Sequence, residues 1–408
     1  MNKNVPKLRF KGFEDEWKSV SLGKLFTFKN GLNKEKEFFG KGTPIVNYTD
    51  VHKNNELTPK NILGLVEVND NEKENYSVKK GDVFFTRTSE TINEIGFTAV
   101  VTEVVKDTVF SGFVLRARPI NKLLNMYFCK YCFSTFSARK EIITKSSYTT
   151  RALTSGSLLK DMNIYIPSLE EQKKIAKFLS NVDKIIEEQE GKVKDLELYK
   201  KGMMQKIFKQ EIRFKDENGI DYPEWENKNL KYVLSEISEK TKENNQYEVL
   251  SSTSTGLFKQ SEYFNREIAS SDNTGYKILK LNQIVLSPQN LWLGNINYNN
   301  KYDMGIVSPS YKIFNINKNL NEKYISYIIK TDRMLYEYKH ASEQGASVVR
   351  RNLNMDLFYD ILINIPCLEE QEKIAKFLSN IDNIVEEENK KLEDLREFKK
   401  GLLQQMFV

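Results

Sequence analysis

The stretch IPSLEEQKKIAKFLSNVD occupies residues 166–183, and residues 365–382 read IPCLEEQEKIAKFLSNID. Over the longer segments 166–208 and 365–407, at a constant offset of 199, 26 of 43 positions are identical. Apolar residues recur at three- and four-residue steps with charged residues between them, which predicts one long amphipathic helix in each segment. The proline at 167 or 366 precedes each helix, and the glutamate pairs 170–171 and 369–370 fall in the first turn, where the helix dipole favours negative charge.

A helix from Glu170 to Ile207 would be roughly 57 Å long at about 1.5 Å per residue. A compact domain cannot bury such a helix, so its apolar stripe needs a partner, which we expect to be the other copy. Gln189 and Glu388 interrupt the stripe and are expected to fix its register. The alternative is two unrelated helices that face solvent. The expected helix-pairing interface consists of Ile175, Phe178, Val182, Ile185, Leu196, Ile374, Phe377, Ile381, Ile384 and Leu395.

The repeat continues more faintly outside the helices. Residues 8–11 (LRFK) and 16–17 (EW) recur as 212–215 (IRFK) and 224–225 (EW). The whole chain of 408 residues is therefore predicted to be a tandem duplication of about 8–208 and 212–408. Because the helices stayed alike while the globular parts diverged, we infer that the helices share one task and the globular parts have two.

Bulk properties exclude some classes of protein. No run approaches eighteen apolar residues and the first residues contain no apolar h-region, which argues against membrane and secreted proteins. Three cysteines without a paired framework fit a reducing cytoplasm. The net charge is +6, and the repeated segments 167–208 and 365–408 carry +1 and −3, which leaves +8 for the rest. This basic excess is expected if the outer regions face a polyanion, although a solvated lysine-rich surface would give the same number.

Catalytic and metal-binding signatures are missing. Cys129 and Cys132 resemble a CxxC motif, but the repeat places Ile325 and Ile328 opposite them, which predicts core positions on an amphipathic helix. The two histidines of the chain are too few for a zinc site of the usual composition. The sequence contains neither a phosphate-binding GxxxxGK[ST] loop nor a GxGxxG motif. The chain is therefore predicted to be a binding protein without a metal or catalytic site of its own.

Two stretches in each half carry side chains suited to DNA. Residues 81–96 read as a strand entering a polar loop, as do residues 282–292, and residues 145–151 correspond to 343–351. Arg, Asn, Gln, Ser and Thr are the side chains that bond base edges and phosphates. Such loops also cover ordinary soluble surfaces. The candidate DNA-binding residues are Arg87, Thr88, Ser89, Asn93, Lys145, Ser146, Ser147, Tyr148, Thr149, Arg151, Gln289, Asn290, Trp292, Gln344, Ser347, Arg350 and Arg351.

This order of segments, a globular half, an IPxLEEQxKIAxFL helix, a second globular half and the same helix again, resembles the DNA-specificity subunit of type I restriction-modification systems. The resemblance covers essentially the full chain. It implies α/β (α+β) target-recognition domains at 1–166 and 211–365, each reading one half of a split, asymmetric DNA sequence. It also implies long helices at 167–210 and 366–408 that form an antiparallel coiled coil between the domains, within a tandem pseudo-twofold repeat.

The resemblance further implies partners and cofactors. Expected partners are double-stranded DNA, two adenine-methyltransferase subunits and two restriction/translocase subunits, with no membrane. S-adenosylmethionine, ATP and Mg²⁺ are expected in those partner subunits and none in this chain, which has no catalytic residues by the same resemblance. The expected location is the bacterial cytoplasm, in association with the nucleoid. The competing hypothesis is a coiled-coil scaffold that assembles partner proteins without reading sequence, and an enzyme acting alone is a third.

Overall fold

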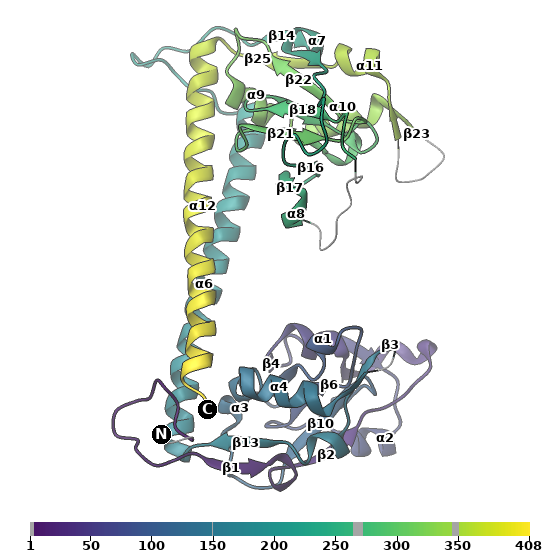
Figure 1. Ribbon diagram of the computed structural model, residues 1–408, viewed down its shortest axis with the longest axis vertical. Coiled ribbons are helices and arrows are strands. Elements are labelled where there is room, and N and C mark those ends of the chain that lie inside the picture. Colours follow the sequence, from purple (N-terminus) through teal and green to yellow (C-terminus); the bar gives the residue numbers. More distant parts are fainter. Residues whose placement is uncertain (1–3, 149, 264–271, 345–350) are drawn as a thin grey trace. The chain divides into compact units, whose positions relative to one another are not determined.

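The computed structural model describes residues 4–148, 150–263, 272–344 and 351–408 (Figure 1). The chain divides into two compact units, unit 1 with residues 1–190 and 390–408 and unit 2 with residues 191–389. Each unit holds one globular domain, one half of the long helix α6 (Leu169–Phe208) and one half of the long helix α12 (Leu368–Gln405). The sequence-based division treated each helix as a segment of its own, whereas in the structure each half-helix belongs to the unit whose core it covers.

Unit 1 is built around a five-stranded sheet in the order β2-β10-β6-β8-β4, antiparallel except for the β4–β8 pair. A three-stranded sheet β5-β3-β9, a three-stranded sheet β11-β12-β7 and the antiparallel pair β1–β13 complete it. The strands are β1 (Lys18–Ser21), β2 (Phe26–Asn30), β3 (Phe39–Val46), β4 (Glu56–Leu57), β5 (Gly64–Val66), β6 (Val83–Thr86), β7 (Thr88–Ser89), β8 (Thr98–Val101), β9 (Val109–Phe110), β10 (Val114–Pro119), β11 (Ser147–Tyr148), β12 (Ala152–Leu153) and β13 (Asn163–Ile166).

Short helices connect these strands: α1 (Tyr48–Lys53), α2 (Asp70–Asn75), α3 (Met126–Cys132), α4 (Phe136–Lys145) and α5 (Gly156–Leu159). Side-chain caps define several of their starts. Asn125 caps α3 by accepting from the Tyr127 and Phe128 amides, and Thr135 caps α4 by accepting from the Ala138 amide. Strand β6 is buried along its whole length, as expected of a strand inside a sheet that is covered on both faces.

Unit 2 has a four-stranded antiparallel sheet in the order β15-β22-β19-β20 and the antiparallel pair β14–β25. The pairs β16–β17, β18–β21 and β23–β24 lie beside them. The elements are β14 (Glu226–Asn229), α7 (Leu230–Val233), β15 (Leu234–Ile237), β16 (Leu250–Ser252), β17 (Leu257–Lys259), α8 (Gln260–Tyr263), β18 (Lys277–Lys280), β19 (Ile284–Leu286), β20 (Ile296–Tyr298), β21 (Met304–Val307), β22 (Lys312–Ile316), α9 (Glu322–Ile328), α10 (Asp332–His340), β23 (Ser342–Gln344), β24 (Arg351–Leu353), α11 (Met355–Asp360) and β25 (Leu362–Ile365).

The two domains share a common frame, which confirms the predicted mixed α/β tandem repeat. The strand order β2-β10-β6-β8 of unit 1 matches β15-β22-β19-β20 of unit 2, and β1–β13 matches β14–β25. The helix pair α3–α4 likewise matches α9–α10. The domains differ in what is added to this frame, since unit 1 has the β5-β3-β9 sheet where unit 2 has the pairs β16–β17 and β18–β21.

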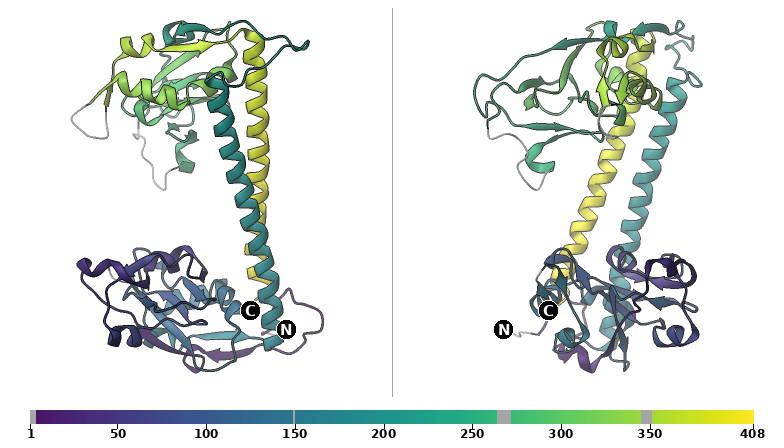
Figure 2. Two further views of the ribbon diagram at one scale, coloured as in Figure 1. Left: turned by 180° about the vertical axis from the view of Figure 1, so that it is seen from behind. Right: turned by 90° about the vertical axis from the view of Figure 1, so that its right-hand side faces the viewer.

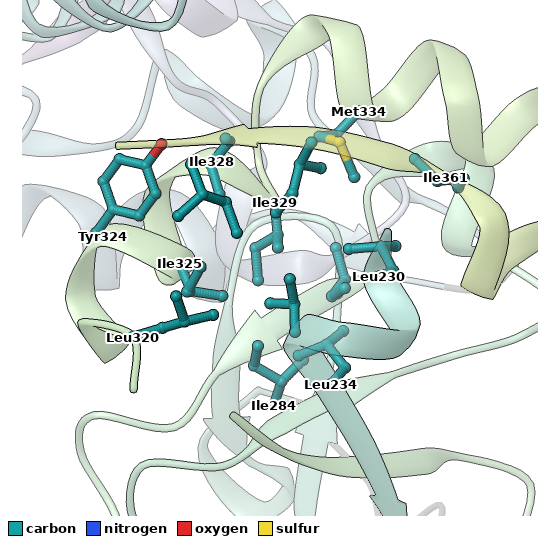
Figure 3. Close-up of a cluster of buried hydrophobic side chains, with 14 of the residues drawn as sticks. Leu230, Leu234, Ile284, Leu320, Tyr324, Ile325, Ile328, Ile329, Met334 and Ile361 are labelled. Carbon is teal, nitrogen blue, oxygen red and sulfur yellow. The ribbon is translucent and has the colours of Figure 1, made fainter. Parts of the chain in front are cut away.

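The core of unit 2 joins the domain to both half-helices. Apolar side chains from α7, β19, α9 and α10 point toward one another in Figure 3 and exclude solvent. Ile207 of α6 and Ile374 and Leu378 of α12 belong to the same buried cluster. Removing such apolar surface from water is the dominant favourable term in folding, so each half-helix is held by the domain as well as by its helical neighbour.

Within each unit the two half-helices run antiparallel, as expected (Figures 1 and 2). In unit 1, Arg396 pairs with Glu190 at 2.7 Å. In unit 2, Lys192 pairs with Glu388 at 3.0 Å, and Glu388 is only 5 % exposed. Glu388 is therefore a buried polar residue in the middle of the stripe, in the position that the sequence suggested would fix the register.

Four residues of the expected helix-pairing interface differ from the expectation. Ile185 and Ile384 are 50 % and 46 % exposed, so their side chains are not buried against the neighbouring helix. Phe178 and Phe377 pack their rings on Phe10 and Phe214, from the segments that precede each domain, at centroid distances of 5.7 and 5.6 Å. The remaining members are buried or half-buried, and they are Ile175, Val182, Leu196, Ile374, Ile381 and Leu395. Each long helix packs against the other long helix and against the segment that precedes the domain, so its apolar face is wider than that of a simple helix pair. The sequence pattern did not show which apolar residue meets which of these two neighbours.

Among the described residues, no helix is long and apolar enough to span a membrane.

Candidate nucleic-acid interface

In unit 1 the two predicted DNA-binding stretches come together in one small sheet. Strand β7 pairs with β12, which pairs with β11, so Thr88 lies opposite Leu153 and Ser89 opposite Ala152. The Thr154 amide donates to the Arg87 carbonyl at 2.9 Å, which continues this pairing. The loop after β6 and the segment after α4 therefore form one surface, although some 60 residues separate them in the sequence.

Two of the predicted side chains on this surface serve the fold. The Arg87 guanidinium is half-buried, and its Nη1 donates to the Gly112 carbonyl at 3.2 Å. Ser89 is only 5 % exposed and its hydroxyl donates to Glu94. Neither side chain is free to reach a ligand without breaking a contact inside the domain.

Other predicted side chains are open to solvent. Tyr148 is 56 % exposed and Arg151 is exposed, and Asn93 and Ser147 are exposed as well. Lys145, Ser146 and Thr88 are half-buried. Thr149 lies outside the described residues.

Beside this sheet lies a hollow of about 370 Å³. Thr88, Ser89 and Arg151 line it, together with residues that the sequence did not single out, namely Tyr48, His52, Glu90, Glu94 and Phe113. The Tyr48 and His52 rings stack at 5.3 Å with an interplanar angle of 23°. The hollow thus combines aromatic faces with hydroxyls, carboxylates and one guanidinium. These polar groups can bond base edges, and the guanidinium can also bond a phosphate. No sequence signal identified Tyr48 and His52, because α1 reaches this place only through the fold.

The structure also bears on the alternative structural role of Arg151. The alternative to a DNA contact of Arg151, suggested by the repeat, is a structural ion pair with Asp161, matched in the second half by Arg350 and Asp360. Within the described residues Arg151 has no ion pair, and its side chain faces the hollow. Arg350 and Ser347 lie outside the described residues.

In unit 2 the corresponding stretches also meet. The Arg351 amide donates to the Gln289 carbonyl at 3.2 Å, and the Arg351 guanidinium lies over the Trp292 ring at 4.9 Å from its centroid. Gln344 ends β23 opposite Arg351 in β24. Gln289 is exposed and Asn290 is half-buried. The Arg351 Nη1 donates to the Lys339 and Ser342 carbonyls at 3.5 Å, and its Nε is buried. Part of this guanidinium therefore serves the fold, and Nη2 is the group that suits contact with phosphate or a base edge.

The CxxC motif belongs to the core, as expected. Cys129 and Cys132 are 2 % and 4 % exposed on α3, and Ile325 and Ile328 occupy the equivalent buried positions on α9. Both thiols are free, and burial raises the pKa of Cys132 well above its ordinary value. The described residues contain no group of three or more His, Cys, Asp or Glu that could hold a metal ion.

The repeated glutamates anchor each domain to its long helix. Both members of each pair lie in the first helical turn as expected, but Glu171 and Glu370 are 1 % and 0 % exposed. Arg9 donates to both carboxylate oxygens of Glu171 at 2.8 Å, and Arg213 donates to Glu370 at 3.4 and 3.0 Å. These ion pairs explain why residues 8–11 and 212–215 repeat with the helices. The hydrogen bond to Glu171 raises the pKa of Arg9, and that to Glu370 raises the pKa of Arg213.

The glutamines that follow form a second anchor. Gln172 accepts from the Asn125 amide at 2.8 Å and donates to the Leu123 carbonyl at 2.9 Å. Gln371 accepts from the Asn321 amide at 2.9 Å. Asn125 and Asn321 are the N-cap residues of α3 and α9, so each glutamine ties the start of a long helix to the start of a domain helix.

A third anchor joins each domain to both half-helices of its unit. Tyr131 donates to Asp183 at 2.7 Å, and Lys399 pairs with the same carboxylate at 2.6 Å. In unit 2, Tyr327 donates to Asp382 at 2.6 Å, and Lys200 pairs with that carboxylate. Burial is the main cause that raises the pKa of both tyrosines above the ordinary range. The same three anchors thus recur residue for residue, while the loop surfaces carried by the two domains differ.

Comparison with known proteins assigns the family. The model of the type I restriction modification DNA specificity domain matches residues 14–198 and again residues 222–397. The chain therefore belongs to the specificity subunits of type I restriction-modification systems. Each match spans one globular domain and most of the long helix that follows it, which agrees with the tandem repeat.

Individual relatives are distant. The type I restriction enzyme MjaVIII specificity subunit of Methanocaldococcus jannaschii is 24 % identical over 337 residues, covering 73 % of each chain. The putative MjaX specificity subunit of the same organism is 23 % identical over 424 residues, covering 98 % of this chain and 95 % of the relative.

Two solved structures share the fold at 15 % identity. The S subunit of a type I system from M. genitalium has a TM-score of 0.53 with 99 % of both chains covered. A chain from a study of complex assembly and conformational transition in the type I system has a TM-score of 0.56, with 97 % and 98 % covered. These likenesses support the architecture, and the loop residues are too diverged for their roles to be transferred.

Proposed function

We propose that this chain reads a bipartite, asymmetric DNA sequence and directs adenine methylation and DNA cleavage by partner subunits. The observation that carries the proposal is the contrast within the chain itself. The anchors at Glu171 and Glu370 and at Gln172 and Gln371 are the same in both halves, whereas the exposed loop surfaces differ. One frame with two different surfaces is what a reader of two different half-sites requires.

The chemistry of the two surfaces supports direct readout. In unit 1 the residues around the hollow offer the Arg151 guanidinium, the Thr88 hydroxyl and the Glu90 carboxylate. Arginine contacts guanine or phosphate, while a carboxylate accepts from the amino group of cytosine, so such a mixed surface can distinguish base pairs in the major groove. In unit 2 the stacked Arg351 and the exposed Gln289 offer a different set. Different donors and acceptors in the two units favour an asymmetric target.

The duplicated frame suits partners that are present in two copies. We propose two adenine-methyltransferase subunits and two restriction/translocase subunits, with S-adenosylmethionine, ATP and Mg²⁺ held by those partners. This chain would then act as a non-catalytic subunit on the bacterial chromosome in the cytoplasm. Its contribution to the reaction is to select the adenine by positioning the complex on the two half-sites.

A scaffold that assembles partners without reading DNA is the competing function. The basic excess of +8 outside the repeated segments favours the DNA reader. The test is fluorescence anisotropy of the complex with its methyltransferase, on the methylated sequence and on a scrambled duplex at several salt concentrations. A specific reader binds the methylated sequence at least 10³-fold more tightly. Equal affinity for both duplexes would establish the scaffold instead.

A further inference from the structure

Unit 2 contains an apolar cavity of about 490 Å³ that the proposed DNA surface does not use. It lies between the end of α6 and the turn from α9 to α10, and β25 closes one side. Its apolar lining consists of Met204, Phe208, Ile328, Met334 and Ile363. Ile328 and Met334 also belong to the buried cluster of Figure 3, so the floor of the cavity is the outer surface of the domain core. A cavity of this size and lining accommodates a large apolar side chain.

The rim of this cavity is basic. Its cations outnumber its carboxylates, with Lys200, Lys201, Lys209, Lys330 and Arg333 against Glu197 and Asp332. Lys200 is neutralised by Asp382. Lys201, Lys209 and Arg333 are exposed and have no carboxylate partner within the part of the chain that the structure describes. An occupant that brings carboxylates would therefore be favoured electrostatically.

Lys330 differs from the other cations of the rim because its ammonium is bonded to backbone carbonyls of the domain. Its ammonium donates to the Gly294 carbonyl at 3.0 Å and to the Ser254 carbonyl at 3.3 Å. Burial lowers the pKa of Lys330 to about 8. Lys330 is thus part of the wall of the cavity and is less available than Arg333 to an incoming carboxylate.

The equivalent place in unit 1 has a matching aromatic wall and a smaller space. There Phe407, which corresponds to Phe208, is 8 % exposed and packs on Trp17 and Phe128 at 5.9 and 5.4 Å. The next residue, Val408, accepts through its carbonyl oxygen from the Ser137 hydroxyl at 2.8 Å. The space left is about 260 Å³. In unit 2 Phe208 packs on Tyr324 at 5.8 Å in the same way, so this wall is shared and the two places differ in the size of the remaining space.

Arg333 stands in unit 2 where Ser137 stands in unit 1, two residues after the capping threonine of the helix. The Ser137 hydroxyl is thereby replaced with a guanidinium. Its Nη2 donates to the Leu362 carbonyl at 3.3 Å, and its further N–H donors can bind a carboxylate. The larger cavity and the guanidinium donor of unit 2 suit an external occupant that brings a carboxylate.

We propose that the unit 2 cavity receives an apolar side chain of the methyltransferase subunit, on a segment whose carboxylates face Arg333, Lys201 and Lys209. This inference rests on the proposed function, which supplies the methyltransferase as a partner. Cavity and rim have separate roles, since the apolar walls provide the anchor and the cations provide orientation and salt dependence.

The experiment measures the affinity of the purified methyltransferase subunit for the full-length chain by biolayer interferometry. Arg333→Glu reverses the rim charge, and Met204→Asp places a carboxylate in the apolar wall. Matched controls are Lys231→Glu, an exposed lysine of α7, and Tyr199→Asp, a residue of α6 that is 52 % exposed and outside the cavity. Each cavity variant should weaken binding at least 10-fold, and each control should remain within about 2-fold. Melting temperatures identify any variant that has lost its fold, and Arg333→Glu, at an exposed position, keeps the test valid if Met204→Asp unfolds.

Each outcome has a separate meaning. If the wild-type chain does not bind the methyltransferase, the proposed function itself fails. If the wild-type chain binds and folded cavity variants bind equally well, the proposed function stands and the cavity has another role. If Arg333→Glu weakens binding to duplex DNA and leaves methyltransferase binding unchanged, the rim contacts phosphates and the inference is overturned.

Discussion

Replacing Arg9 by alanine should destabilise unit 1 strongly. The Arg9 guanidinium makes two hydrogen bonds of 2.8 Å to Glu171, whose side chain is 1 % exposed. Without Arg9 this carboxylate is buried without its counter-charge. The Trp17 indole N–H, the counterpart in the repeat of the Trp225 N–H, has no hydrogen-bond partner among the described residues. Breaking a buried pair by removing one partner costs about 3–5 kcal/mol. We expect Arg9→Ala to lower the free energy of unfolding of unit 1 by that amount.

The equivalent change in unit 2 should cost less. Glu370 also accepts from the Trp225 indole N–H at 3.0 Å, and this bond remains when Arg213 is replaced. We therefore expect Arg213→Ala to cost about 1–3 kcal/mol, the range for a buried group that keeps part of its hydrogen bonding. Urea unfolding followed by hydrogen-exchange mass spectrometry assigns each loss to peptides of one unit.

A double-mutant cycle tests the physical reason. The cycle compares Arg9→Ala, Glu171→Gln and the two together, and the double variant has no unpaired charge. The double variant should be more stable than the sum of the single losses predicts, by about 2 kcal/mol or more. Additive losses within about 0.5 kcal/mol would refute the reasoning, as would equal losses for Arg9→Ala and Arg213→Ala.

The remaining predictions concern DNA binding, the third anchor and pH. Arg151→Ala should weaken binding of the methyltransferase complex to target and non-target duplexes by similar factors and make the log-affinity against log-salt slope shallower by about one unit; an unchanged slope with a lower melting temperature would assign Arg151 to structure. Tyr131→Phe and Tyr327→Phe should each cost about 1.5–3 kcal/mol, because each removes a hydrogen bond to a carboxylate; a melting temperature that stays unchanged in both would refute the anchor. The pKa of Lys330, about 8 in the folded protein against 10.5 ordinarily, means that the folded state binds fewer protons between these values. Stability should therefore rise with pH in that window, and Lys330→Met should remove this rise in melting temperature; a rise of equal size in the variant would contradict it.

Much of the frame could be predicted from the sequence, because a repeat constrains structure twice. The 199-residue offset and the three- and four-residue apolar spacing predicted both long helices and the tandem architecture. The repeat also placed Cys129 and Cys132 in the core by setting isoleucines opposite them. Contacts between residues far apart in the chain could not be predicted from the sequence. The repeated Arg9 was visible in the sequence, but its pairing with Glu171 depends on how residues 4–17 return to the helix.

The candidate DNA-binding site was likewise predicted only in part from the sequence. Residue type identified Thr88 in the loop after a predicted strand and Arg151 in the repeated segment before the long helix, and the structure brings both to one hollow. The sequence could not show that the Arg87 guanidinium and the Ser89 hydroxyl would be held by contacts inside the domain, because both residue types are also typical of exposed loops. Tyr48 and His52 carry no motif, and only the fold of α1 brings them beside the hollow. Likewise the apolar stripe predicted Ile185 and Ile384 as pairing residues, since periodicity alone does not tell on which side a helix meets its neighbour.

We propose that two different domains on one repeated frame read two half-sites independently. Single-molecule sequencing of methylated adenines tests this directly, in a host that carries the wild-type gene, no copy, or a chimera with residues 1–166 from another member of the family. The account predicts a bipartite methylated sequence with the wild-type gene, none without it, and a change in only one half-site with the chimera. A chimera that methylates its DNA with both half-sites changed, or with neither changed, would contradict the account.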